Sequence, residues 1–251
     1  MEDSPIGLDK WLPAIWMLCG CKNGISSYEI HRDLGVSQKC GWFMLHRIRL
    51  AMQRGSLNKL SGEIEADETF IGGKVENMHL DKQVRRIMHG KGGRGPKGKA
   101  IVMGLLERHG EARVKVIPTR RKKHVQAMVK EHVEPKSALY TDALKSYDGL
   151  DEYAHEVIDH TEAYVRDAVH TNGLENFWSL MKRTLKGTYV SVEPFHLQAY
   201  ADEQAFRFNN RGSKDEPVND AQRFVKALSQ VSGRRLTFAE LTGKGLDAPM
   251  S

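Results

Sequence analysis

The sequence predicts an α/β fold in which a mixed sheet is flanked by helices and preceded by a helical segment. Residues 64–70 alternate apolar with polar side chains, which is the period of a strand with one covered face. After residue 60 the patterns predict three strands, a helix, two strands and two helices, in that order. Residues 1–60 have helical patterns, and 40% of the 251 residues are hydrophobic, enough for a packed core.

The N-terminal segment carries clear helix boundary signals. Ser26 and Glu29 match a capping box, in which both side chains bond free backbone N–H groups. Gly35 is placed to close the short helix that follows, and Ser37 to cap the next one. The expected helices are residues 9–19, a short one ending at 34, and one running from 38 to about 53.

The short helix, the turn and the next helix have the outline of a helix-turn-helix. Gln38 and Lys39, together with Trp42, would then be placed to meet DNA. The alternative is an ordinary helical hairpin without DNA contact, because the outline alone is a weak signal.

Strands are expected on both sides of a basic, glycine-rich segment. A glycine pair stops the strand 64–70. Residues 89–99 are too rich in glycine for a helix and too basic for a core. We expect there a mobile loop that folds onto phosphates, or else a solvated hairpin tip. Residues 100–106 and 112–118 have the pattern of the next two strands.

Helix and strand patterns alternate in the rest of the chain. Pro135 ends one helix, whereas Thr171 is placed to cap another that Gly187 ends. The expected elements are a helix over 120–133, strands over 137–142 and 153–158, helices over 172–186 and 194–209, and an amphipathic segment over 220–231.

Three antiparallel strands followed by parallel strands joined through helices form the ribonuclease-H-like arrangement. In it the first strand is central, the strand after the first helix lies beside it, and the helix after the fifth strand packs across their ends. We therefore expect a helix-turn-helix-like DNA-binding segment over residues 1–60, a ribonuclease-H-like catalytic domain over 61–212 and a C-terminal appendage over 213–251.

Charge is distributed unevenly along the chain, whose net charge is +6. Residues 71–130 contain 16 Lys and Arg against 4 Asp and Glu, whereas residues 131–180 contain 3 against 11. The basic part predicts a polyanion as partner, and bound divalent cations would explain the acidic part. The side chains expected to meet phosphates are Lys91, Arg94, Lys97, Arg120, Arg121, Lys122 and Lys123.

Three acids are expected to converge at one edge of the sheet. Asp67 lies on the first strand, Asp142 ends the strand after the first helix, and Glu175 lies one turn into the late helix. They are 75 and 33 residues apart in sequence. Three neighbouring carboxylates repel one another, and two Mg²⁺ ions would neutralise them. Two such ions about 3.5–4 Å apart promote phosphodiester chemistry.

Two of these positions have competitors. Glu68 competes with Asp67, but it points to the other face of the strand if Asp67 shares the face of Glu65. Asn172 competes with Glu175, because residues three apart lie on one helical face.

Basic residues follow on the same late helix. Lys182 lies seven residues after Glu175 on the same face and could hold a phosphate near the metals. Arg183 is next to it, and we count it among the DNA contacts.

Composition excludes several other classes. No apolar run reaches the roughly 18 residues that span a bilayer, so no membrane is expected. Cys19, Cys21 and Cys40 form no CxxC pair, which disfavours a zinc ribbon or a disulfide framework. A reducing cytoplasm is the expected location.

Several stretches together resemble a known family. They are IEADETFIGGK, YTDALKSYDG, HTNGLENFWSLMKRTLKGTY and HLQAYADEQAFRFNNR. They look like the catalytic domain of bacterial insertion-sequence transposases of the DDE class, in the group that often carries a zinc ribbon. WLPAIWM and GISSYEIHRDLGVSQKCGWFMLHRIR resemble that group's helix-turn-helix-like segment. The likeness covers roughly residues 8–211.

The resemblance implies that Asp67, Asp142 and Glu175 bind the metals and that the lysine-bearing end of the late helix assists. Some relatives place Asn at the third acidic position, which keeps Asn172 open. No Cys-rich ribbon precedes the helical segment, so a truncated or alternative-start product is expected.

The expected function is that of a DNA transposase. It would use two Mg²⁺ ions, which Mn²⁺ can replace, to hydrolyse a phosphodiester at the element's ends and then join the freed 3′-OH to target DNA. Its partners would be double-stranded DNA, both element ends and target, with the protein a homo-oligomer on DNA. The rivals are a ribonuclease-H-like nuclease that only hydrolyses, and a DNA-binding inhibitor or repressor acting through residues 20–55.

Overall fold

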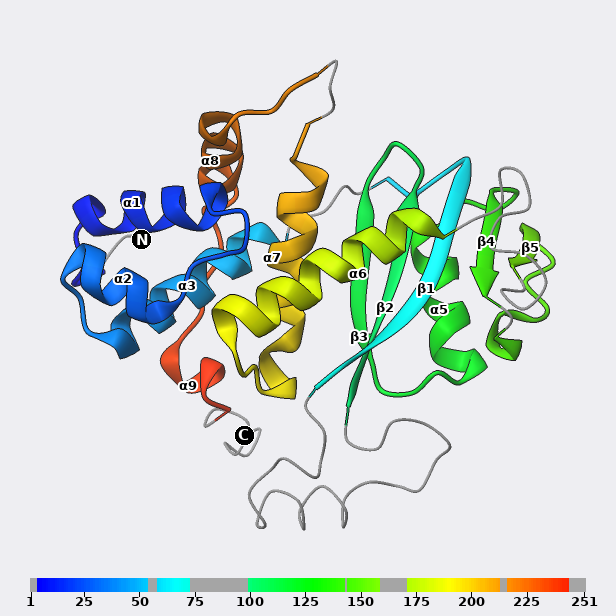
Figure 1. The fold of residues 1–251 in the computed structure, drawn as a ribbon, viewed down its shortest axis with the longest axis horizontal. Helices are drawn as coiled ribbons and strands as arrows, with labels where there is room; N and C mark the ends of the chain where they lie inside the picture. The colour runs from blue at the N-terminus through cyan, green and yellow to red at the C-terminus, as the bar shows by residue number, and fades with distance from the viewer. Residues whose placement is uncertain are drawn as a thin grey trace, which may run out of the picture. The chain divides into compact units, whose positions relative to one another are not determined.

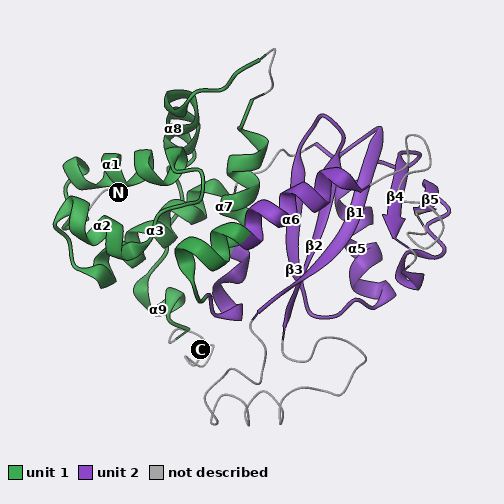
Figure 2. Ribbon diagram, in the orientation of Figure 1, with its two compact units in different colours: residues 1–55, 183–191, 199–251 green, residues 56–182, 192–198 purple. Residues whose placement is uncertain are grey.

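The computed structural model describes residues 4–53, 58–72, 99–142, 144–158, 171–212 and 216–243 (Figure 1). The chain forms two compact units (Figure 2). The sheet unit contains residues 56–182 and 192–198, and the helical unit contains residues 1–55, 183–191 and 199–251. Within the described ranges, no helix combines the length and the apolar character needed to cross a membrane.

The sheet unit is built on five strands in the order β3-β2-β1-β4-β5. Strands β1, β2 and β3 pair antiparallel, whereas β1, β4 and β5 pair parallel. The predicted α/β class with a mixed sheet and a central first strand is therefore confirmed (Figure 1). The strands are β1 (Glu63–Ile71), β2 (Ala100–Glu107), β3 (Ala112–Ile117), β4 (Ala138–Asp142) and β5 (Ala154–Ile158).

Helices cover both faces of this sheet. On one face, Val125 and Met128 of α5 (Lys122–His132) share a core with Ile64 and Ala66 of β1. On the other face lies α6 (Asn172–Thr184), which donates hydrogen bonds to Glu65 and Asp67 of β1. The expected strand with one covered face is thus wrong, because Glu65 is as buried as its apolar neighbours. A central strand with helices on both sides of its sheet is buried on both faces, so alternation in sequence does not mark a solvent side.

The open edge of the sheet is protected by one side chain. Gln198 accepts a hydrogen bond from Val116 N at 2.7 Å and donates one to Val114 O at 3.1 Å. Both partners are backbone groups of the edge strand β3. Gln198 therefore takes the place of a neighbouring strand and limits edge-to-edge association. It follows the 3₁₀ turn η4 (Pro194–His196), at the start of α7 (Leu197–Asn209).

The helical unit forms around the N-terminal helices, with the boundary signals in the expected places. Ser26 Oγ accepts a bond from Glu29 N at 3.2 Å, and Glu29 Oε2 accepts one from Ser26 N at 2.7 Å. Gly35 adopts the left-handed conformation, and Ser37 Oγ accepts a bond from Cys40 N at 3.2 Å. The helices are α1 (Leu8–Gly20), α2 (Ser27–Leu34) and α3 (Gln38–Met52).

The C-terminal segment packs into this same unit. Its helices are α8 (Asp220–Ser229) and α9 (Phe238–Leu241). Ala227 is buried in the core of the N-terminal helices, and the rings of Phe224 and Trp16 meet edge to face at 5.7 Å. Phe238 of α9 lies 6.0 Å from the Phe43 ring of α3. Ala227, Phe224 and Phe238, which come from the segment that the sequence marks as an appendage, therefore pack against the N-terminal helices.

The end of α6 differs from expectation. The helix does not stop at Gly187 but continues from Thr184 into a π-helical turn, η3 (Leu185–Tyr189). Val190, with a φ of 58°, ends this turn. The wider turn allows the Tyr189 hydroxyl to reach Glu203 of α7, at 2.6 Å. The bond between Tyr189 and Glu203 favours continuation of the helical turn through Gly187, although glycine often ends a helix.

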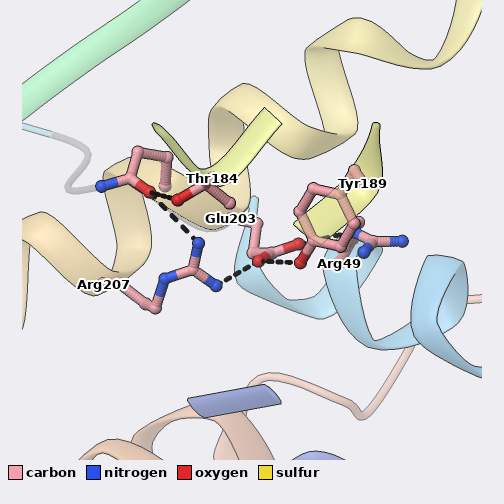
Figure 3. Close-up of polar contacts among 6 residues, drawn as sticks. Arg49, Thr184, Tyr189, Glu203 and Arg207 are labelled. Atoms are coloured by element: carbon pink, nitrogen blue, oxygen red, sulfur yellow. Dashed lines mark hydrogen bonds and ion pairs between the residues drawn. The ribbon is translucent and has the colours of Figure 1, made fainter. Parts of the chain in front are cut away.

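Glu203 is the centre of a buried ion-pair cluster (Figure 3). Its carboxylate, which has no exposed surface, accepts hydrogen bonds from Arg49 Nε at 2.6 Å, from Arg207 and from Tyr189. Burial alone would raise the pKa of Glu203, but Arg207 and Arg49 outweigh burial and the pKa is lowered. The cluster joins α3, η3 and α7 within the helical unit.

We predict that Glu203→Ala lowers the free energy of unfolding by about 3–5 kcal/mol, because Arg49 and Arg207 would remain buried without a counter-charge. The matched control is Glu131→Ala, which breaks an exposed pair with Lys115 at 2.9 Å and is expected to cost at most about 1 kcal/mol. Urea unfolding followed by tryptophan fluorescence measures both. Equal losses in the two variants would contradict a stabilising role for the cluster.

Candidate active site

Two acids lie side by side at the edge of the sheet where the parallel pairing of the inner strands β1 and β4 ends. In the parallel pairing of β1 with β4, Ala66 faces Thr141. Asp67 and Asp142 are the next residue on each strand, so their side chains project from neighbouring strands toward the same face. Asp142 ends β4, and its Oδ1 accepts a hydrogen bond from Leu144 N at 3.2 Å. The sheet therefore brings together two carboxylates that are 75 residues apart in sequence.

The carboxylate of Asp67 is held by two donors. Trp178 Nε1 of α6 donates to Asp67 Oδ2 at 2.8 Å, and Glu68 N donates to Asp67 Oδ1 at 2.7 Å. Gly104 of β2 pairs with Asp67 in the antiparallel register. Both oxygens of this carboxylate thus have a partner within the sheet unit.

Helix α6 is held at this edge by a hydrogen bond between its first turn and β1. The buried Glu65 Oε2 accepts a hydrogen bond from Leu174 N at 3.0 Å. A carboxylate at a helix N-terminus satisfies a free N–H group and complements the helix dipole. Gly173 permits the close approach, because a Cβ there would lie 2.4 Å from Leu106 Cδ2. Glu175 is therefore carried in the exposed first turn of α6.

The acids influence one another electrostatically. Burial raises the pKa of Asp67, and the bonds from Trp178 and Glu68 N oppose that rise. The negative charges of Asp142 and Glu175 raise it further. Asp142 and Glu175 therefore both lie within electrostatic range of Asp67.

These carboxylates do not form a closed metal cage. Over the described residues, no three His, Cys, Asp or Glu side chains lie close enough together to hold a metal ion. The donor set nonetheless fits a hard cation, because carboxylate oxygens are the ligands that Mg²⁺ prefers and their mutual repulsion favours a positive charge.

Glu68 is a fourth acid at this end of β1, on the opposite face from Asp67. The buried Tyr147 of the 3₁₀ turn η2 (Lys145–Tyr147) donates its hydroxyl hydrogen to Glu68 Oε1. Burial raises the pKa of Glu68 to about 7, with Tyr147 opposing the rise and Asp142 and Asp67 adding to it. Glu68 therefore belongs to the acidic group, although it does not share the α6 face with Asp67.

The remaining candidate residues of α6 lie in its first and last turns. Asn172 and Glu175 are both exposed in the first turn. Lys182 is half-buried seven residues after Glu175, about 10 Å along the helix, and Arg183 beside it is exposed.

The N-terminal DNA-contact candidates have partners inside the helical unit. Gln38 Nε2 donates to Ser27 Oγ at 2.8 Å, which ties the start of α3 to the start of α2. The Lys39 ammonium lies 4.5 Å from the ring of Phe238. The half-buried Trp42 lies edge to face with His46 at 4.8 Å.

The other basic candidates gather at the start of α5. Arg121 is its N-cap, and Lys122 and Lys123 form the exposed first turn. The Arg120 guanidinium lies 4.9 Å from the ring of Phe70, near the end of β1. Cations at a helix N-terminus oppose the helix dipole, so these charges do not serve the stability of α5. The remaining candidates, Lys91, Arg94 and Lys97, lie outside the described residues.

Four residues of this site were not found by reading the sequence: Glu65, Gly104, Tyr147 and Trp178. Two signals were available. An isolated glycine within a strand pattern, as at Gly104, marks a close approach of another group. Trp178 follows Glu175 by three residues and so shares its helical face. Nothing local marks Glu65 or Tyr147, whose partners are 109 and 79 residues away.

The chain is similar to known transposase sequences. Residues 59–209 match the model of a family described as ISXO2-like transposase domain. An uncharacterized transposase-like protein of Haemophilus influenzae is 33% identical over 103 residues, which make up 40% of this chain and 83% of that protein. An uncharacterized protein in transposable element ISH50 of Halobacterium salinarum is 26% identical over 192 residues, 73% of this chain and 64% of that protein.

The raised pKa of Glu68 predicts how stability depends on pH in metal-free protein. The folded state holds this proton more tightly than the unfolded chain, whose glutamates titrate near 4.5. The contribution is complete below pH 4.5 and is lost as pH rises through about 7. In the wild type we expect the free energy of unfolding to fall by roughly 1–3 kcal/mol between pH 4.5 and pH 7. Glu68→Gln cannot ionise at this position, so the variant should lack this fall.

The measurement is urea unfolding in a chelating buffer from pH 4 to pH 8. Glu131→Gln is the control with the opposite sign, because its bond with Lys115 lowers the pKa of Glu131 and stabilises the protein at higher pH. A Glu68→Gln profile that overlays the wild type would show that Glu68 ionises normally in the folded protein.

Proposed function

The chain belongs to the family of ISXO2-like transposase domains, and from this membership we propose that it cuts DNA at the ends of an insertion sequence and joins them to target DNA. The family supports a transposase role of the DDE class. The observation that carries the catalytic part of the proposal is the adjacent placement of Asp67 and Asp142 at the edge over which α6 presents Glu175.

Asp67, Asp142 and Glu175 are the residues that would hold two Mg²⁺ ions, or Mn²⁺ in their place. Asn172 is the alternative to Glu175, since both are exposed in the same helical turn. When bound, such a pair of ions activates an attacking oxygen and stabilises a leaving oxygen in phosphodiester displacement.

The reaction has two steps with the same chemistry. Water attacks the scissile phosphorus, the P–O bond to the 3′ oxygen breaks, and the strand is left with a 3′-OH. That 3′-OH then attacks a phosphorus of target DNA and displaces its 3′ oxygen. No covalent protein–DNA intermediate is formed, so the site needs carboxylates and phosphate contacts rather than a nucleophilic side chain.

Basic residues would hold the DNA near these acids. The N-cap and first turn of α5 present Arg121, Lys122 and Lys123 to solvent, where their charges gain nothing from the helix dipole. The phosphate backbone of DNA would neutralise these positive charges. Lys182 and Arg183 would contact phosphate along α6.

Asp67→Asn, Asp142→Asn and Glu175→Gln are each expected to abolish cleavage and joining of end-sequence DNA in Mg²⁺ or Mn²⁺, while DNA binding stays intact or improves. Each loses a cation ligand and also some repulsion toward phosphate. Asp151→Asn, an exposed acid-to-amide change outside the site, is the control and should stay active. Full activity in Glu175→Gln with loss in Asn172→Ala would move the third ligand to Asn172.

Supplying pre-cleaved ends to the wild type separates the proposed function from its rivals. Joined products support a transposase. Cut DNA without joining would identify a nuclease that only hydrolyses, and bound but unchanged DNA would identify an inhibitor or repressor.

The basic first turn of α5 predicts a salt effect. Log affinity for duplex DNA falls with log salt by about 0.9 for each phosphate neutralised. Replacing Arg121, Lys122 and Lys123 with Ala should flatten that slope by up to this amount per residue, equally for end and scrambled sequences. Lys130→Ala removes an exposed charge at the far end of α5 and is the control. An unchanged slope in the triple variant would show that these three side chains face solvent and do not contact phosphate.

A further inference from the structure

The indole of Trp178 lies between α6 and the sheet. The side chain is buried, and its ring packs edge to face with Phe177 at 5.1 Å. Nε1–H, the single hydrogen-bond donor of an indole, points at Asp67 Oδ2, at 2.8 Å. A buried indole normally satisfies this donor with whatever acceptor is near, but here the acceptor is an acid of the candidate active site.

The position of the ring is fixed by Gly104. This residue faces Asp67 across the β1–β2 ladder. A Cβ at Gly104 would lie 2.7 Å and 2.8 Å from two carbons of the Trp178 ring and 2.9 Å from Leu174 Cδ2. Any side chain there would therefore displace the indole from Asp67. The glycine creates the space that brings the donor within reach of the carboxylate.

The bond from Trp178 to Asp67 affects the placement of both Asp67 and Glu175. With Glu68 N on Oδ1 and the indole on Oδ2, both ends of the Asp67 carboxylate are held, and the remaining lone pairs keep a defined direction. The same indole belongs to α6, three residues after Glu175. It therefore ties the helix that carries Glu175 to the strand that carries Asp67.

We propose that Trp178 is a positioning residue of the cation site: its indole N–H orients Asp67, fixes α6 against β1, and thereby sets the affinity for divalent cations. This inference rests on the proposed function, because it requires that Asp67 binds a cation. Groups that hydrogen-bond to metal-ligating carboxylates orient them, and their removal typically lowers metal affinity about 10–100-fold.

The test is Trp178→Phe, which keeps an aromatic ring at the site and removes the donor. Mn²⁺ binding to the full chain is titrated by the electron paramagnetic resonance signal of free Mn²⁺, with no reaction involved. We expect the Kd for Mn²⁺ to rise about 10–100-fold. The matched control is Trp16→Phe on α1, where the indole is half-exposed and packs on Phe224, and the Kd should equal that of the wild type.

The variant Asp67→Asn distinguishes failure of the cation site from failure of the positioning role of Trp178. If it abolishes Mn²⁺ binding while Trp178→Phe binds like the wild type, the cation site stands and the role of Trp178 is wrong. If the wild type binds no Mn²⁺, or Asp67→Asn binds as the wild type does, the proposed cation site fails and the positioning role fails with it.

A measurement on the wild type covers the case in which Trp178→Phe does not fold. The chain has four tryptophans, so ¹⁵N-tryptophan labelling yields four indole N–H signals. We expect Mg²⁺ to shift one signal well beyond the others, and Mn²⁺ to broaden that same signal. Assignment by the Trp16→Phe spectrum and by Trp42→Phe and Trp11→Phe spectra should leave Trp178. A Trp178 signal that does not move with Mg²⁺ would overturn the proposal.

Discussion

The docking of α6 against β1 is the contact on which the candidate site depends. Two carboxylates of one strand face, Glu65 and Asp67, each accept a hydrogen bond from α6, one from Leu174 N and one from Trp178 Nε1. Hydrogen bonds to charged groups contribute about 1.5–3 kcal/mol each, and leaving such a group buried without its partner costs more. Close approach needs small residues, and Gly104 and Gly173 supply them. The helix that carries Glu175 is thus held by the same strand that carries Asp67.

At the sheet edge, burial and neighbouring negative charge outweigh the hydrogen bonds and the Arg120 charge that favour ionised Asp67 and Glu68. Burial and neighbouring carboxylates raise the pKa values of Asp67 and Glu68, so these acids destabilise one another when ionised. In the helical unit the opposite holds, since the buried Glu203 has two arginines and a tyrosine as partners. The buried Glu203 is therefore stabilised by cations of its own protein, whereas burial and neighbouring carboxylates disfavour the ionised forms of Asp67 and Glu68. Raised carboxylate pKa values of this kind are common at functional sites, and they support the proposal that Asp67 belongs to one.

Local signals predicted much of the fold, and long-range contacts account for what they missed. The caps at Ser26 and Ser37 were readable because their partners lie three residues away. Strand order followed from the alternation of patterns, and it placed Asp67 beside Asp142. The burial of Glu65 was not readable, because its partner lies on a helix 109 residues later. The end of α6 was misjudged because the tyrosine in its last turn bonds to α7, which no local rule at Gly187 reveals.

We propose that Asp67, Asp142 and Glu175 together bind the divalent cations that act on DNA. The most direct measurement is anomalous X-ray scattering from Mn²⁺ in crystals of the protein bound to end-sequence DNA. We expect two Mn²⁺ peaks, each within coordination distance of a phosphate oxygen and of at least one of the three carboxylates. Peaks bound by other residues, or DNA bound at this edge with no peak beside Asp67 and Asp142, would contradict it.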